Sequence, residues 1–203
     1  MCRFGLAAIL TPQSLLARRT GPAAGLLVST LLGVALSACA PLALSRPVTK
    51  LGLIAPFEGS QRAVGYEALY AVKLALREAN ASGGAGGWQV ELVALDDDDL
   101  PSLAIRQARA LAVDPDVTYA IGVAPPSESS SLQQQYAALG LPAEFVDPAA
   151  ASAAGIDPAF ATRYLAISNG VQPGSLAVRA YTAARSALTH ITQQVQTTGH
   201  PTR

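Results

Sequence analysis

Apolar residues recur along the chain in two alternating patterns, and these patterns predict its secondary structure. The continuous apolar run Val48–Ala55 is typical of a buried strand, which Pro56 ends. After a loop over 57–64, a helix is expected to about Ala81, where Gly83 and Gly84 follow. Its apolar positions repeat at steps of three and four residues and predict one buried face: Leu69, Val72, Leu76 and Ala79.

The alternation of strand and helix continues to residue 146. An acidic loop, Asp96–Asp99, and a turn that begins with Pro125-Pro126 separate two strands from the helices that follow them. The second predicted helix has a buried side of Ile105, Ala108 and Leu111. The predicted strands are Gln89–Leu95, Thr118–Val123 and Leu141–Val146, and the predicted helices run from Pro101 to about Asp114 and from Ser129 to Leu139.

The last quarter of the chain contains helices and no strand. Asp157 and Pro158 are typical of a helix N-cap and first turn, and this helix is expected to reach about Ser168 before Asn169-Gly170 ends it. A long helix follows over 174–197. Its buried face is predicted by Tyr181, Ala184, Leu188, Ile191 and Val195.

These elements predict an α/β fold: a three-layer parallel sheet with helices on both faces, plus carboxy-terminal helices. Right-handed crossovers place all strand-to-helix loops of such a sheet at one edge. The loops at 56–64, 96–101 and 123–128 are therefore expected to lie together. Ligands of open α/β sheets usually bind at that edge.

A leader precedes this region. Arg18 and Arg19 come before the apolar run Ala23–Ala35, which is shorter than the roughly 20 residues that a membrane span needs. It is typical of a signal peptide. Ser37-Ala38-Cys39 resembles a lipobox, in which small residues let a peptidase cut beside a lipid-modified thiol. The alternatives are an ordinary signal peptide with an incidental cysteine and an uncleaved anchor. Twin-arginine export is also open, although Thr20-Gly21-Pro22 fits it poorly.

Charge and cysteine content agree with export and acylation. The chain is 50% hydrophobic with a formal net charge of +0. Cleavage before Cys39 removes three arginines and leaves 11 basic against 14 acidic residues, and the basic residues are not clustered, which argues against nucleic acid as a partner. Cys39 is then the single cysteine of the mature chain, so no internal disulfide forms. The predicted domains are a signal peptide (1–38), a tether (39–47), an α/β lobe (48–147) and a helical segment packed on it (148–203).

The segment 51–87 reads LGLIAPFEGSQRAVGYEALYAVKLALREANASGGAGG, and WQVELVALDDDD and TYAIG follow. This resembles the amino-terminal lobe of the branched-chain amino acid binding proteins, which have the type I periplasmic binding protein fold. FATRYLAISNGVQPGSLAVRAYTAARSAL resembles the carboxy-terminal segment of that family. Family members are about twice as long as the predicted mature chain and close two lobes on a ligand. The resemblance therefore implies an internally shortened relative with about one lobe, whose junction lies between about Ala124 and Ala154.

The resemblance also implies a ligand site. In the family, the loops after the first and third strands hold the ammonium and carboxylate groups of the ligand. The matching positions here are Phe57, Glu58 and Gly59 in the first loop, and Ser127, Ser129 and Ser130, with Pro126, in the second. Ser127 is the preferred carboxylate contact, since a helix amino-terminus favours an anion. Alternatively Ser127 or Ser129 only caps the helix, and Glu58 is only a solvated loop residue.

Other chemistries find little support in the sequence. Asp96–Asp99 suggests calcium, but the spacing is not that of an EF-hand, and repulsion among four carboxylates predicts an exposed turn. His190 and His200 have no companion at metal-ligand spacing, and Gly-x-Ser-x-Gly and phosphate-loop motifs are absent. No enzyme activity, metal or cofactor is expected.

The resemblance therefore implies an extracytoplasmic solute-binding protein of an ABC transporter, held to a membrane by lipid on Cys39. Its partners would be a branched-chain or other small amino acid or amide, and a permease. The alternative is a shortened lipoprotein that no longer binds a ligand and serves as an interaction module. A third interpretation is a degenerate product that folds poorly.

Overall fold

The computed structural model describes residues 46–150 and 155–203. The leader, Cys39 and most of the tether lie outside the described residues. Four strands form one parallel sheet in the order β2-β1-β3-β4. The strands are β1 (Val48–Ala55), β2 (Gln89–Asp96), β3 (Val117–Val123) and β4 (Ala143–Val146). All four predicted strands are confirmed, and β4 begins after Pro142, which has no N–H to donate to a ladder.

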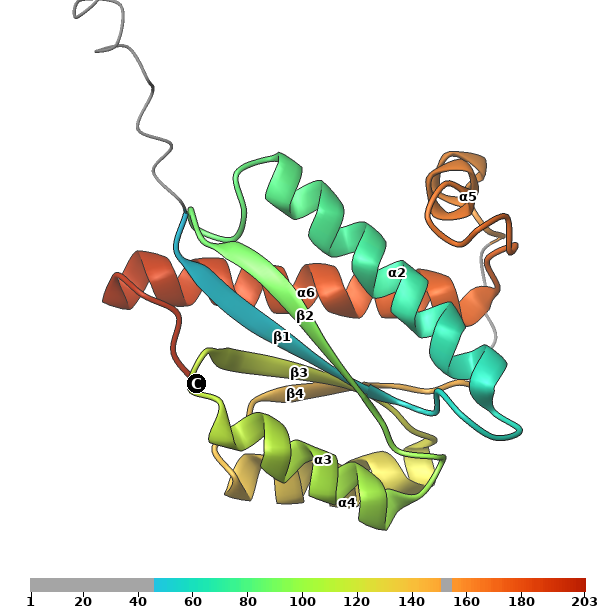
Figure 1. The fold of residues 1–203 in the computed structure, drawn as a ribbon, viewed down its shortest axis with the longest axis horizontal. Coiled ribbons are helices and arrows are strands. Elements are labelled where there is room, and N and C mark those ends of the chain that lie inside the picture. The colour runs from blue at the N-terminus through green and yellow to red at the C-terminus, as the bar shows by residue number, and fades with distance from the viewer. Residues whose placement is uncertain (1–45, 151–154) are drawn as a thin grey trace, which may run out of the picture. The chain divides into compact units, whose positions relative to one another are not determined.

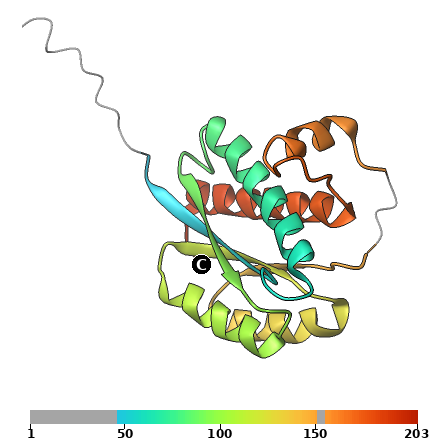
Figure 2. The ribbon, with the colours of Figure 1, turned by 45° about the vertical axis from the view of Figure 1, so that its right-hand side comes forward.

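Helices cover both faces of the sheet, as the sequence predicted (Figure 1). One face is covered by α2 (Arg62–Ala81) and α6 (Ser175–Thr198), and the other by α3 (Pro101–Val113) and α4 (Pro126–Ala138). The short helix α5 (Pro158–Leu165) lies on the same side as α2 and α6 (Figure 2). A buried hydrophobic cluster lies on each face of the sheet, and alternate residues of β1 belong to one or the other. Leu51, Leu53 and Ala55 face α2 and α6, whereas Ile54 faces α3 and α4.

The buried face of α2 differs from the one predicted. Leu69 and Ala79 are only partly buried, whereas Ala68, Ala71 and Ala75 are fully buried. The physical reason is that α2 packs against both the sheet and α6, so its buried stripe is wider than a single contact would require. Small alanine side chains along this stripe let α2 and α6 approach one another closely.

Gly65 allows the start of α2 to lie against the end of β1. A Cβ at this position would come within 1.9 Å of the Pro56 carbonyl oxygen. Glycine inside a helix normally costs about 1 kcal/mol relative to alanine. Here it is needed, because the backbone that follows β1 occupies the space of a side chain. The helix begins at Arg62, so the last three residues of the expected loop 57–64 belong to α2.

Side-chain hydrogen bonds and an ion pair attach the carboxy-terminal helices to α2. The Glu67 carboxylate accepts a hydrogen bond of 2.8 Å from the backbone N–H of Ala177, in the first turn of α6. Glu78 accepts one of 2.5 Å from the Tyr181 hydroxyl, and its other oxygen lies 3.0 Å from Nε of Arg163 in α5. Asp157 caps α5 by accepting from the backbone N–H of Ala159, which confirms the predicted N-cap.

The end of the chain lies at the edge where the strands begin (Figure 1). The Arg203 guanidinium donates to the Val117 carbonyl oxygen at the start of β3, at 2.8 Å, and to the Ala112 and Asp114 carbonyl oxygens at the end of α3. The opposite edge, where the strands end, is therefore not covered by the tail. Among residues 46–150 and 155–203, no helix has the length and apolar character to cross a membrane.

Candidate functional site

The strands all end at one edge of the sheet, which we call the carboxyl edge. The loops that follow β1, β2, β3 and β4 meet there, as the sequence predicted for the first three. A cavity of about 340 Å³ opens between them. Most of its wall is apolar, and its polar side chains are one amide and one carboxylate. It is lined by Pro56, Gln61, Val64, Asp99, Val123, Pro125, Pro148 and Ala149.

Three helices begin at this edge without a side-chain cap. The N-cap residues of α2, α3 and α4 are Gln61, Leu100 and Pro125, and none makes a capping hydrogen bond. The other two helices have acidic partners at their starts, since Asp157 caps α5 and Glu67 accepts from the first turn of α6. Uncapped helix starts leave backbone N–H groups and the positive end of the helix dipole free for an anion. Two of these N-cap residues, Gln61 and Pro125, line the cavity.

Asp96 holds the first loop in place. Its Oδ1 accepts hydrogen bonds from the backbone N–H groups of Phe57 at 2.6 Å and Glu58 at 3.3 Å, and another from Asp98 at 3.3 Å. The carboxylate at the end of β2 therefore braces the loop after β1. This gives the entrance of α2 a defined position beside the cavity.

The acidic turn is not uniformly exposed, and the prediction of a solvated run is wrong for Asp97. Asp97 is 5% exposed and accepts a hydrogen bond of 3.1 Å from the backbone N–H of Asp99. Burial raises the pKa of its carboxyl to about 6. Because Asp98 and Asp99 adopt positive φ angles of 48° and 58°, the chain turns sharply here. Asp99 lies at the cavity wall, whereas Asp97 is buried and does not line the cavity.

The first three predicted site residues lie beside the cavity but do not line it. Phe57 is half-buried and packs edge-on against Tyr66, with ring centroids 5.8 Å apart. Glu58 and Gly59 are exposed. Gly59 has a φ of +68°, and a Cβ there would lie 3.0 Å from Oδ1 of Asp98. The backbone conformation and this close approach explain a glycine at the position without a role in ligand binding.

The three predicted serines lie inside α4, because the helix begins at Pro126 and not at Ser129. A proline at the first position fixes the helical φ, which outweighs the low helix preference of the serines. Ser127 and Ser130 are exposed, and Ser129 donates weakly to the Pro126 carbonyl oxygen at 3.4 Å. Neither Ser127 nor Ser129 is the N-cap, so the alternative of a capping serine is wrong.

Sequence reasoning missed Gln61, Asp99 and Pro148 as cavity residues. For Asp99 a signal existed: it belongs to a loop that the parallel topology already placed at the carboxyl edge. Gln61 lay inside the expected loop but carries no motif. Pro148 could not be found, because its place depends on how the chain leaves β4.

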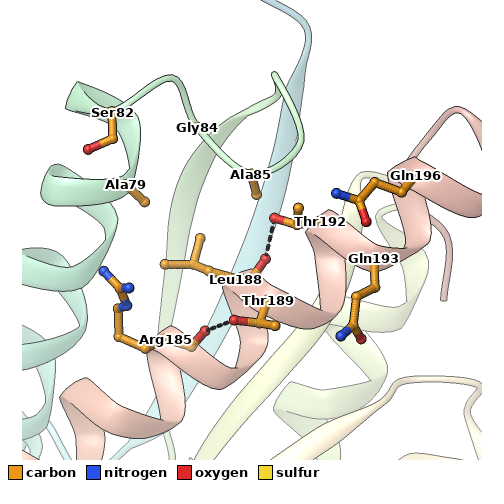
Figure 3. Close-up of a pocket in the computed structure, with 10 residues that line it drawn as sticks. All are labelled: Ala79, Ser82, Gly84, Ala85, Arg185, Leu188, Thr189, Thr192, Gln193 and Gln196. Carbon is orange, nitrogen blue, oxygen red and sulfur yellow. Dashed lines mark hydrogen bonds between the residues drawn. The ribbon is translucent and has the colours of Figure 1, made fainter.

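Two other features bear on where a ligand or a metal ion could bind. In the part of the chain that the structure describes, no three His, Cys, Asp or Glu side chains are grouped to hold a metal ion. A second cavity, of about 490 Å³, lies between the end of α2 and the second half of α6 (Figure 3). It is remote from the carboxyl edge, and the hydroxyls of Thr189 and Thr192 in it already donate to helix carbonyl oxygens.

Residues 48–199 match the periplasmic binding protein family, and the chain belongs to it. The family consists of extracytoplasmic solute-binding proteins, not enzymes. This agrees with the parallel sheet and the cavity at its carboxyl edge. No curated protein matches the chain.

Solved structures with a similar fold come from several bacteria. A protein of Rhodospirillum rubrum assigned to branched-chain amino acid ABC transport is 29% identical over 57% of this chain and 32% of its own, with a TM-score of 0.45. The branched-chain amino acid substrate-binding protein LivJ of Streptococcus pneumoniae, solved with isoleucine, is 25% identical over 52% and 30%, with a TM-score of 0.45. A type 1 periplasmic binding protein of Bordetella pertussis is 29% identical over 47% and 26%, with a TM-score of 0.43. The matched region thus spans about a third of these structures or less.

Proposed function

We propose that this protein is the solute-binding component of an ABC transporter for branched-chain or other small amino acids, anchored to the cell membrane by lipid on Cys39. It would capture its ligand at the carboxyl edge and deliver it to a permease without covalent chemistry. The observation that carries the proposal is the pair of uncapped helix starts, of α2 and α4, whose N-cap residues line a mainly apolar cavity.

The chemistry of the cavity suits an α-amino acid. Free N–H groups at the start of α2 would receive the α-carboxylate, since Gln61 makes no capping bond and the first turn holds no acidic residue. The Asp99 carboxylate would pair with the ammonium group. Apolar walls from Val64, Val123 and Pro148 suit an aliphatic side chain.

Calorimetry with leucine, isoleucine, valine and glutamate tests the proposal. We expect heat with the aliphatic amino acids and little with glutamate, whose side-chain carboxylate would meet apolar walls. Asp99→Asn should reduce leucine affinity by about tenfold or more, because the ammonium group loses its counter-charge. Asp116→Asn is the matched control, since Asp116 is exposed and lies at the opposite edge, near Lys50.

One observation favours a second candidate, an interaction module without a ligand. The cavity is bounded by one lobe, whereas binding pockets normally enclose most of a ligand. None of Phe57, Glu58, Gly59, Ser127, Ser129 and Ser130 lines it. Absence of heat with every amino acid would support this candidate. Light scattering with and without leucine would show whether a second copy supplies the missing wall, in which case ligand should raise the molar mass.

A further inference from the structure

Six of the eleven aromatic residues of the chain form one continuous series of ring contacts. The rings come from the β1–α2 loop, α2, α5 and α6. Neighbouring centroids lie 5.3 to 6.3 Å apart, which is the range of favourable aromatic pairs. The series runs Phe57, Tyr66, Tyr70, Tyr164, Phe160 and Tyr181.

A groove of about 590 Å³ lies over the half-buried part of this series. We call it the tyrosine groove. It lies outside the carboxyl-edge cavity and shares no lining residue with it. Its lining is mainly apolar and aromatic, and Val171, which is 55% exposed, stands at one side. The residues that line it are Arg62, Ala63, Tyr66, Glu67, Tyr70, Val171 and Gln172.

The walls of the tyrosine groove are fixed by packing beneath it. Tyr164 is fully buried, meets Tyr70 at 90°, and donates its hydroxyl proton to the Glu67 carbonyl oxygen at 3.2 Å. The hydroxyl of the buried Ser168 donates to the Val171 carbonyl oxygen at 2.7 Å. The aromatic surface is therefore held in place before any ligand arrives, which reduces the entropy cost of binding.

The polar side chains of the tyrosine groove are one guanidinium, two phenol hydroxyls, one amide and one carboxylate, from Arg62, Tyr66, Tyr70, Gln172 and Glu67. The guanidinium carbon of Arg62 lies 5.1 Å from the centre of the Tyr66 ring, and Arg62 forms no ion pair with another described residue. Neither the Tyr66 nor the Tyr70 hydroxyl bonds to another described residue. Glu67 is the one acid of the lining, and it already accepts from the Ala177 N–H at the positive end of α6. The unmatched charge is thus the cation of Arg62.

From this arrangement we propose that the tyrosine groove is a second ligand site, and that its ligand is a small molecule with a flat aromatic ring and a carboxylate. The ring would stack on the surface formed by Tyr66, Tyr70 and the Arg62 guanidinium, and the carboxylate would accept from Arg62 and the tyrosine hydroxyls. This site is independent of amino acid capture at the carboxyl edge.

Fluorescence anisotropy of 2-naphthoate tests this, with 2-naphthalenemethanol and 2-naphthylmethylammonium as the neutral and cationic analogues. We expect the carboxylate to bind at least fivefold more tightly than either analogue. Arg62→Gln should remove that preference. Val171→Glu, which leaves the aromatic packing intact, should weaken naphthoate binding by repulsion and leave leucine binding unchanged. Arg109→Gln, on the opposite face in α3, is the matched control.

Three results would overturn the proposal. One is the absence of naphthoate binding. Another is that the three probes bind with equal affinity and that Arg62→Gln leaves these affinities unchanged. The third is self-association of the protein that Val171→Glu abolishes, because the groove would then be a contact between copies. Thermal unfolding of each variant checks that the fold is retained.

Discussion

The Glu67 carboxylate of α2 accepts a hydrogen bond of 2.8 Å from the backbone N–H of Ala177, 110 positions later in the chain. This contact supplies α6 with the acceptor that its own N-cap residue, Gly174, lacks. Gly174 lies against the same carboxylate, and a Cβ at that position would come 2.6 Å from Oε1 of Glu67. The start of α6 is thus defined by a residue of another helix.

Glu67→Ala should lower the free energy of unfolding by about 1–2 kcal/mol, because the first turn of α6 loses both a hydrogen-bond acceptor and a negative charge. Glu67→Gln keeps the acceptor and should cost less. Urea unfolding followed by circular dichroism measures both. Lys73→Ala, at an exposed position of the same helix, should change stability by less than about 0.5 kcal/mol. Equal losses for Glu67→Ala and Lys73→Ala would contradict the assigned role.

Gly65→Ala should destabilise the protein by at least about 2 kcal/mol, because the new methyl group would lie 1.9 Å from the Pro56 carbonyl oxygen. The loop after β1 must then move, so leucine affinity should fall as well. Gly155→Ala is the control, since a Cβ at Gly155 meets nothing within 4 Å. Thermal melting of the two variants measures the effect. An unchanged melting temperature for Gly65→Ala would show that the close contact between Gly65 and the Pro56 carbonyl is not required for the fold.

Asp97 should make the protein less stable as pH rises through weakly acidic values. The folded-state pKa is about 6, above the unfolded value of about 4. The folded chain therefore binds more protons between these two values, so this group's contribution falls from about pH 4 to about pH 6 and is constant above. Asp97→Asn removes the buried charge and keeps an acceptor for the Asp99 N–H. It should stabilise the protein at pH 7 by about 1–3 kcal/mol.

The measurement is the difference in unfolding free energy between the wild type and Asp97→Asn at pH 4, 5, 6 and 7. Taking the difference cancels the contributions of other carboxyls to the pH dependence of stability. One of these is Asp114, whose pKa is lowered by its hydrogen bond to Lys50 and whose contribution has the opposite sign. A difference that does not change with pH would contradict the raised pKa.

Ser127→Ala should leave stability within about 0.5 kcal/mol of the wild type, because Ser127 is exposed and is not the cap of α4. Asp157→Ala should cost about 1 kcal/mol, because it removes the acceptor for the Ala159 N–H. Chemical unfolding of the two variants measures how much each side chain contributes to stability at the start of its helix. A large loss of stability for Ser127→Ala would indicate that Ser127 caps α4, contrary to the structure.

Cys39→Ser should release the protein from the membrane fraction, and Cys2→Ser should not. Lipid on Cys39 would anchor the chain, whereas Cys2 belongs to the predicted leader. Cell fractionation with mass spectrometry of the amino-terminal peptide measures both effects. A mature wild-type chain that carries an unmodified Cys39 thiol would contradict the anchor.

Much of the fold could be predicted from local patterns, because strands and caps depend on neighbouring residues. The run Val48–Ala55 and the cap at Asp157 were predicted in this way and are confirmed. The wider buried stripe of α2, with Ala68 and Ala71, could not be, since it depends on α6, which lies a hundred residues away.

The candidate site was predicted less completely. The carboxyl edge follows from topology, so its location was predictable. Which side chains face the cavity depends on local turns: the positive φ angles at Asp98 and Asp99 place Asp99 at the wall and Asp97 in the interior. The serine run suggested a loop, but Pro126 starts the helix earlier and places Ser127 and Ser130 on the exposed surface.

Arg179 of α6 fixes the place where the chain leaves the sheet. Its guanidinium donates to the carbonyl oxygens of Asp147 at 2.8 Å and Pro148 at 3.5 Å, and the Ser175 hydroxyl donates to Ala150 at 3.3 Å. The exit from β4 and the entry to α6 are thereby secured to each other. Because Pro148 also lines the cavity at the carboxyl edge, the Arg179 side chain of a distant helix helps to set the shape of the cavity wall.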